Sequence, residues 1–85
     1  MTVPKKLEWT DQAKSDLRNI DRVTALRILH SVARYRSTGE GDVKSLQDRV
    51  PPELRLRVSD YRVRFYDLED AILILAVKHR REAYR

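Results

Sequence analysis

The sequence predicts an α+β protein in which a helical hairpin packs on one face of a small antiparallel sheet. Three observations lead to this fold class: helical spacing of apolar residues in the first half of the chain, two strictly alternating runs after residue 53, and one continuous apolar run near the end. The expected order of elements is β-α-α-β-β-β. Helices gathered on one side of an antiparallel sheet are typical of the α+β class.

The first half is expected to form one short strand and two helices. Residues 6–10 alternate weakly, as a strand does, and Thr10 or Asp11 then offers a side chain that can cap a helix. The apolar positions of this first helix are Ala13, Leu17 and Ile20. Asp21 can cap a second helix, which Gly39 is expected to end.

Residues 42–52 are expected to be a connecting loop, because Pro51 and Pro52 exclude helix. The alternating runs at 54–58 and 61–65 then predict a β-hairpin that turns at residues 59–60.

The apolar run at residues 71–77 predicts a strand that is covered on both faces. It would complete an antiparallel meander with the hairpin, and the first strand is expected to join the edge of the sheet. The tail at residues 78–85 is abruptly basic.

The predicted hairpin gathers four arginines on one face. With a two-residue turn, Arg57 lies opposite Arg62, and Arg55 lies opposite Arg64. The other face then pairs Leu56 with Val63 and Leu54 with Phe65. Like charges across a strand pair are destabilising by up to about 1 kcal/mol. The simplest reason to keep them is a polyanion or an acidic partner that covers this face.

The composition bounds the kind of protein. At 85 residues the chain is expected to form one domain, residues 1–85, with a net charge of +5 and 13 arginines among its 18 basic residues. A basic domain indicates nucleic acid, an acidic protein or a membrane surface as partner. There is no cysteine for a disulfide or thiolate site, and we expect no secretory signal and no membrane-spanning segment. A cytoplasmic location is therefore expected.

Three segments resemble the RelE/ParE superfamily of type II toxin–antitoxin toxins. Residues 54–63 (LRLRVSDYRV) resemble the arginine-rich hairpin of that superfamily, and residues 43–46 (VKSL) resemble the segment that leads into it. Residues 77–85 (VKHRREAYR) resemble the ending of the RelE branch. The chain departs from the pattern at Ser59, where glycine is common, and at Glu53, near a position where several members carry a basic residue. Glu53 would either repel phosphate or pair with a neighbouring arginine.

The resemblance implies a cytoplasmic toxin with a RelE-like fold, a cognate antitoxin as partner, and cleavage of mRNA in the ribosome without metal or small-molecule cofactor. Two alternatives remain: a gyrase-poisoning protein binder of the ParE kind, or an inactive member that only binds its antitoxin. The RelE-like ending favours RNA cleavage.

The chemistry of RNA cleavage guides the choice of candidate residues. Internal attack on the phosphodiester requires that the 2′-hydroxyl lose a proton, that the phosphorane be stabilised, and that the leaving oxygen be protonated. Arginines suit the second requirement. The candidate catalytic residues are Arg62, Arg80 and Tyr84, and the candidate phosphate-binding residues are Lys44, Arg55, Arg57 and Arg81.

Several of these roles have alternatives. Tyr84 acts either as general base or as a stacking platform, and His79 is an alternative acid. Arg57 and Arg64 either contact RNA or pair with acidic residues of the antitoxin, and Lys44 either contacts phosphate or faces solvent.

Overall fold

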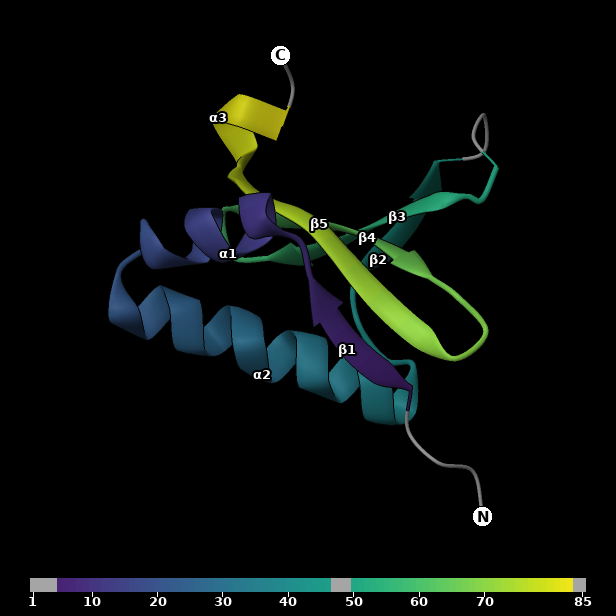
Figure 1. Cartoon of the computed structure of the whole chain (residues 1–85). Helices are drawn as coiled ribbons and strands as arrows, with labels where there is room; N and C mark the ends of the chain where they lie inside the picture. Colours follow the sequence, from purple (N-terminus) through teal and green to yellow (C-terminus); the bar gives the residue numbers. More distant parts are fainter. Residues whose placement is uncertain (1–4, 47–49, 84–85) are drawn as a thin grey trace.

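The computed structural model describes residues 5–46 and 50–83. Its helices and strands form one sheet with the long second helix below it and the short last helix above it (Figure 1). They are β1 (Lys6–Trp9), α1 (Asp11–Arg18), α2 (Arg22–Thr38), β2 (Val43–Leu46), β3 (Glu53–Val58), β4 (Tyr61–Asp67), β5 (Ala71–His79) and α3 (Arg80–Ala83). The α+β fold class is confirmed.

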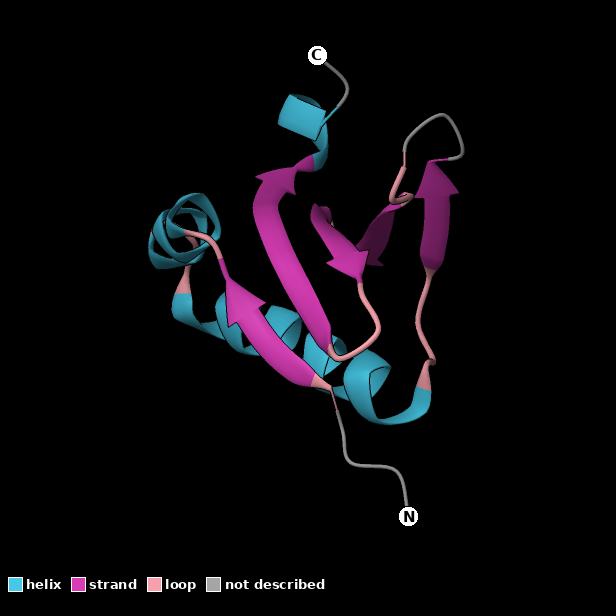
Figure 2. Cartoon of the chain, turned by 45° about the vertical axis from the view of Figure 1, so that its right-hand side comes forward, coloured by secondary structure: helices cyan, strands magenta, loops and turns pink. Residues whose placement is uncertain are grey.

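The five strands form one mixed sheet in the order β1-β5-β4-β3-β2 (Figure 2). β1 joins the edge, as expected, but it runs parallel to β5, so the sheet is not purely antiparallel. The predicted meander is confirmed, since β3, β4 and β5 are antiparallel neighbours.

The segment predicted as a connecting loop contains a further strand, β2. Lys44 lies opposite Arg55, and the backbone N–H of Arg57 donates to the carbonyl oxygen of Asp42 at 2.9 Å. Gly41 allows this approach, because a Cβ there would lie only 2.8 Å from Leu56 Cδ1. The strand was missed because its apolar residues, Val43 and Leu46, do not alternate.

The predicted helix boundaries are confirmed by their caps. The hydroxyl of Thr10 accepts from the Ala13 N–H at 3.1 Å, and the carboxylate of Asp21 accepts from the Thr24 N–H at 3.0 Å. Gly39 ends α2 in the left-handed conformation, with φ of 74°.

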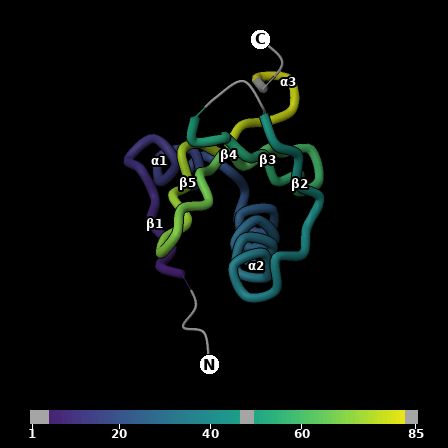
Figure 3. Tube along the Cα trace, turned by 90° about the vertical axis from the view of Figure 1, so that its right-hand side faces the viewer, coloured from purple at the N-terminus to yellow at the C-terminus, as the bar shows by residue number. Residues whose placement is uncertain are grey.

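The core lies between α2 and the sheet. Ile28 and Val32 of α2 are buried with Val63 and Phe65 of β4. Figure 3 views α2 nearly end-on, with β2, β3 and β4 above it. Because side chains alternate along a strand, this core fixes the arginines of the hairpin on the opposite face. No helix among the described residues is long and apolar enough to span a membrane.

Candidate functional site

The hairpin of β3 and β4 has the register that the sequence predicts. Arg57 lies opposite Arg62, and Arg55 lies opposite Arg64. Ser59, the first residue of the two-residue turn, has a φ of 54°, the region that a type II′ turn requires at this position. Glycine adopts this conformation without strain, which accounts for its frequency there in the superfamily. The four arginines therefore share the face that is opposite to α2.

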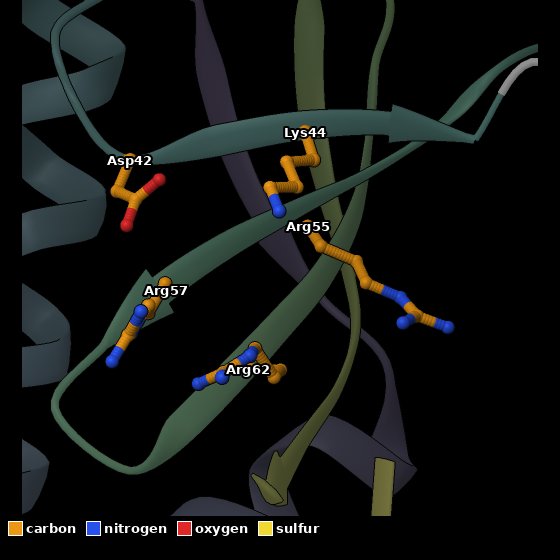
Figure 4. Close-up of a pocket in the computed structure, with 5 residues that line it drawn as sticks. All are labelled: Asp42, Lys44, Arg55, Arg57 and Arg62. Carbon is orange, nitrogen blue, oxygen red and sulfur yellow. The ribbon is translucent and has the colours of Figure 1, made fainter. Parts of the chain in front are cut away.

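A hollow of about 230 Å³ lies over this face (Figure 4). It is lined by Asp42, Lys44, Arg55, Arg57 and Arg62. β2 contributes Lys44, β3 contributes the two arginines at 55 and 57, and β4 contributes Arg62. The structure thus brings together four predicted site residues that are up to 18 positions apart in the chain.

Three of these cations have no acidic partner among the described residues. Lys44, Arg55 and Arg57 form no ion pair within 4.0 Å in residues 5–46 and 50–83. The Nε of Arg55 is buried without a hydrogen-bond partner in the same part of the chain. A buried donor without a partner costs free energy in the folded state.

Arg62 is held differently within the same hollow. Its Nη1 donates to the carbonyl oxygen of Tyr61 at 3.2 Å, which fixes the guanidinium near the turn. In Figure 4 the side chains of Arg57 and Arg62 run in a similar direction, while Arg55 extends the other way. The hollow therefore presents donors on both of its sides.

Arg64, on the same face, is already neutralised by Glu53. Its Nη2 and Nε donate to the two carboxylate oxygens at 2.7 and 3.1 Å, and the Glu53 side chain is only 1% exposed. The hydrogen bond to Glu53 raises the pKa of Arg64, so this arginine stays charged and held. Of the two alternatives for Glu53, pairing with a neighbouring arginine is therefore correct. Arg64 finds its acidic partner within the chain rather than on an antitoxin.

Lys78 of β5 is neutralised as well, by Asp16 of α1. The Lys78 ammonium lies 3.0 Å from one Asp16 oxygen, and the Val77 N–H donates to the other at 3.0 Å. Burial opposes ionisation of Asp16, but hydrogen bonds from Val77, Lys78 and Gln12 together bring its pKa below the ordinary 3.8. Asp16 thereby provides a hydrogen-bond acceptor for the edge of β5 that extends past β1 and has no neighbouring strand there.

The tail is not brought into the hollow. The Arg80 N–H donates to the Asp60 carbonyl oxygen at 2.6 Å, and the Arg80 guanidinium, 60% exposed, lies 4.0 Å from the Asp60 carboxylate. Arg81 donates its backbone N–H to Nδ1 of His79 at 3.3 Å. Neither arginine lines the hollow, so the structure does not unite Arg80 and Arg81 with Arg55 and Arg62 around one phosphate. Arg80 and Arg81 lie outside the hollow because β5 ends at His79 and α3 then turns toward the hairpin turn.

Two further predicted roles fall elsewhere. Tyr84 lies outside the described residues. His79 packs edge-on against Tyr61, with ring centroids 5.3 Å apart, which fits the support of the tail better than proton transfer in the hollow.

Asp42 is the residue of the hollow that sequence reasoning missed. Its signal was present, because Asp42 and Lys44 are two positions apart and so share a face once the segment is known to be extended. The missed strand β2 therefore also concealed this carboxylate.

The sheet and the helical pair have the fold of solved RelE toxins. Similar solved structures include archaeal RelE in its complex with RelB from Pyrococcus horikoshii OT3, with a TM-score of 0.78, 21% identity and coverage of 92% of this chain and 97% of that one. The RelB–RelE complex from Methanococcus jannaschii has a TM-score of 0.75 at 20% identity, with coverage of 91% and 94%. A mutant of E. coli RelE in the free state has a TM-score of 0.67 at 12% identity, with coverage of 96% and 90%.

The sequence itself identifies the family. Residues 7–84 match the family of the ParE toxin of the type II toxin–antitoxin system, parDE, and the chain belongs to this family. A comparison with curated proteins gave no match. Membership in the RelE/ParE superfamily is thus confirmed. The RelE branch stays a prediction, because the family is that of ParE while the solved structures named above are RelE toxins.

Proposed function

We propose that this type II toxin inhibits translation by cleaving mRNA in the ribosome. The observation that carries the proposal is the hollow, where Lys44, Arg55 and Arg57 have no ion pair among the described residues and Arg62 stands beside them. Four clustered cations on rigid strands suit a phosphodiester, because guanidinium groups donate to phosphate oxygens in pairs.

The same cations suit the transition state. Internal attack by a ribose 2′-oxygen produces a phosphorane with an additional negative charge, and donors that are already in place stabilise that charge without rearrangement. Arg62 has the central role in this proposal, since its backbone contact orients it at the turn. Arg55 and Arg57 bind the flanking phosphate oxygens, and Lys44 neutralises the negative charge of the RNA backbone where it passes β2. Alignment of the mRNA by the ribosome would lower the remaining barrier.

The tail has a separate part in the proposal. Arg80 and Arg81 bind the RNA backbone next to the hollow, rather than the scissile phosphate, because α3 lies beside the hairpin turn. The resemblance assigns Tyr84 as general base or stacking residue, and this assignment remains a prediction.

A cognate antitoxin is the second part of the proposal. Two of the similar structures named above are toxin–antitoxin complexes, RelE with RelB. An antitoxin segment with acidic side chains would neutralise the unpaired cations and would exclude RNA from the hollow. Since the ribosome is the proposed target, the toxin would act in the cytoplasm.

A second candidate function is the poisoning of DNA gyrase. The match of residues 7–84 to the ParE family favours it. In that case the hollow would bind an acidic surface of the enzyme or the DNA backbone, and the chain would perform no chemistry.

Induced expression of the chain in bacteria separates these functions. Growth arrest with immediate loss of protein synthesis and new mRNA 5′ ends is the expected result. Arg62→Ala should relieve the arrest, whereas Arg34→Ala should not, because Arg34 lies on α2 in an exposed pair with Glu40. Damage to DNA with translation initially intact would contradict RNA cleavage and favour gyrase. Normal growth with abundant folded protein would indicate an inactive member.

A further inference from the structure

The hollow contains one carboxylate among its four cations. Of the five residues that line it, Asp42 is acidic, and it forms no ion pair within 4.0 Å with a described residue. In Figure 4 its carboxylate points from the residue before β2 toward Arg57. An ionised, unpaired carboxylate repels phosphate, so its presence in a phosphate site requires a reason.

The backbone fixes the position of Asp42. Its carbonyl oxygen accepts from the Arg57 N–H at 2.9 Å, and Gly41 allows the chain to pass close to Leu56. Asp42 thus stands at a fixed place on the rim of the hollow, one strand away from Arg57 and two strands away from Arg62. A base for catalysis needs such a fixed position within reach of the proton that it takes.

We propose that Asp42 is the proton acceptor for the ribose 2′-hydroxyl, an inference that rests on the proposed RNA cleavage and leaves Tyr84 the stacking role. The carboxylate takes the 2′-hydroxyl proton while the 2′-oxygen forms a bond to phosphorus. The bond from phosphorus to the 5′-oxygen breaks, and that oxygen takes a proton from a water molecule. The hydroxide that remains takes the proton from the Asp42 carboxyl group, which turns the hydroxide back into water and regenerates the carboxylate. The products are a 2′,3′-cyclic phosphate and a 5′-hydroxyl end, and the numbers of atoms and electrons are unchanged.

The other acidic side chains near this face do not fit the role. Both oxygens of Glu53 are held by Arg64, and its side chain is 1% exposed, so no hydroxyl can reach it. Asp60 lies at the hairpin turn beside Arg80 and does not line the hollow. Asp16 is held by Val77 and Lys78.

The test compares Asp42→Asn with Glu40→Gln, which removes the same charge two residues earlier and outside the hollow. Cleavage of ribosome-bound mRNA is measured at saturating toxin, and binding is measured with a single-stranded oligonucleotide that lacks the 2′-hydroxyl. General-base catalysis is worth roughly 10²–10⁴-fold. We therefore expect Asp42→Asn to cleave at least about 100-fold more slowly and to bind the oligonucleotide as tightly as the wild type, or more tightly. Glu40→Gln should match the wild type in both measurements.

The pH profile gives a readout that a structural role would not change. The groups that line the hollow with Asp42 are Lys44 from β2, Arg55 and Arg57 from β3, and Arg62 from β4. A reaction that depends on one base loses about tenfold in rate per pH unit on the acid limb of its profile, and the wild type should show such a limb. This acid limb should be absent in Asp42→Asn and retained in Asp42→Glu.

Each outcome decides the inference. Equal or faster cleavage by Asp42→Asn overturns it and makes Asp42 a repulsive charge only. A wild type that binds RNA but never cleaves it overturns the proposed function, and the base with it. If the thermal unfolding of Asp42→Asn is unchanged, its lower cleavage rate is not caused by loss of the fold. If Asp42→Glu cleaves as slowly as Asp42→Asn and both variants bind the oligonucleotide more weakly than the wild type, Asp42 has a structural role and the inference is overturned.

Discussion

Two groups of cations share one face of the sheet and differ in their partners. Arg64 and Lys78 are held by Glu53 and Asp16, with N–O distances of 2.7 and 3.0 Å. Lys44, Arg55 and Arg57, beside them, have no such partner in the described residues. The comparison teaches that net charge alone does not locate a site. The site is where the charge has been left uncompensated, because such cations can exchange water for a ligand without breaking an ion pair.

The largest effect that sharpens this comparison is expected from Arg62. Removal of one preorganised donor to a transition-state oxyanion typically lowers the rate roughly 10²–10³-fold. We expect a loss of that size for Arg62→Ala in the cleavage of ribosome-bound mRNA, followed by primer extension. Arg34→Ala, which removes an equal charge from the exposed pair with Glu40, should leave the rate unchanged. Equal losses in both variants would show that only overall charge matters.

The next effect concerns stability and lies in the paired group. Glu53→Ala should lower the free energy of unfolding by about 3 kcal/mol, since it leaves a partly buried guanidinium without its partner. Glu40→Ala breaks a pair of similar length that is exposed, and it should cost at most about 0.5 kcal/mol. Urea denaturation of the three proteins measures both values. Similar costs at the two positions would mean that burial of Glu53 has no energetic consequence.

A smaller effect is expected at Asp16 and depends on pH. Because its folded-state pKa lies below the ordinary 3.8, Asp16 stabilises the fold above about pH 4, and this contribution is lost as the pH falls through the folded value. Asp16→Asn keeps an acceptor for Val77 but loses the charge beside Lys78, so we expect a cost of about 1 kcal/mol at pH 7. The difference from wild type should shrink toward pH 3. Unfolding curves at pH 7 and pH 3 check this, and a difference that is independent of pH would contradict the assigned cause.

Much of the fold could be predicted from the sequence because its apolar residues recur clearly at the spacing of a helix or of a strand. The alternation of the hairpin gave the correct register, and the capping residues Thr10, Asp21 and Gly39 gave the helix boundaries. The direction of β1 could not be read in this way, because a strand has the same period in parallel and antiparallel sheets. After β1, the two helices carry the chain to β2 at the other edge of the sheet, so β1 has no neighbour in sequence to define its direction.

The site was only partly predictable, and for a physical reason. Alternation places arginines on a face, but it does not tell which of them have acidic partners from distant elements. Asp16 reaches Lys78 over 62 positions, and Glu53 reaches Arg64 diagonally across the hairpin. Asp42 was missed because β2 was not predicted. The pairing of β2 with β3 is made by backbone groups, and the side chains of β2 do not show the alternation that predicts a strand.

The most direct test of the account is an NMR titration of the arginine Nε–H signals with a single-stranded oligonucleotide that cannot be cleaved. The signals of Arg55 and Arg57 are expected to shift on binding, while that of Arg64 is expected to stay in place because Glu53 keeps its hydrogen bonds to it. A titration in which Arg64 shifts as much as Arg57, or in which none of the three responds, would contradict the claim that uncompensated charge defines the site.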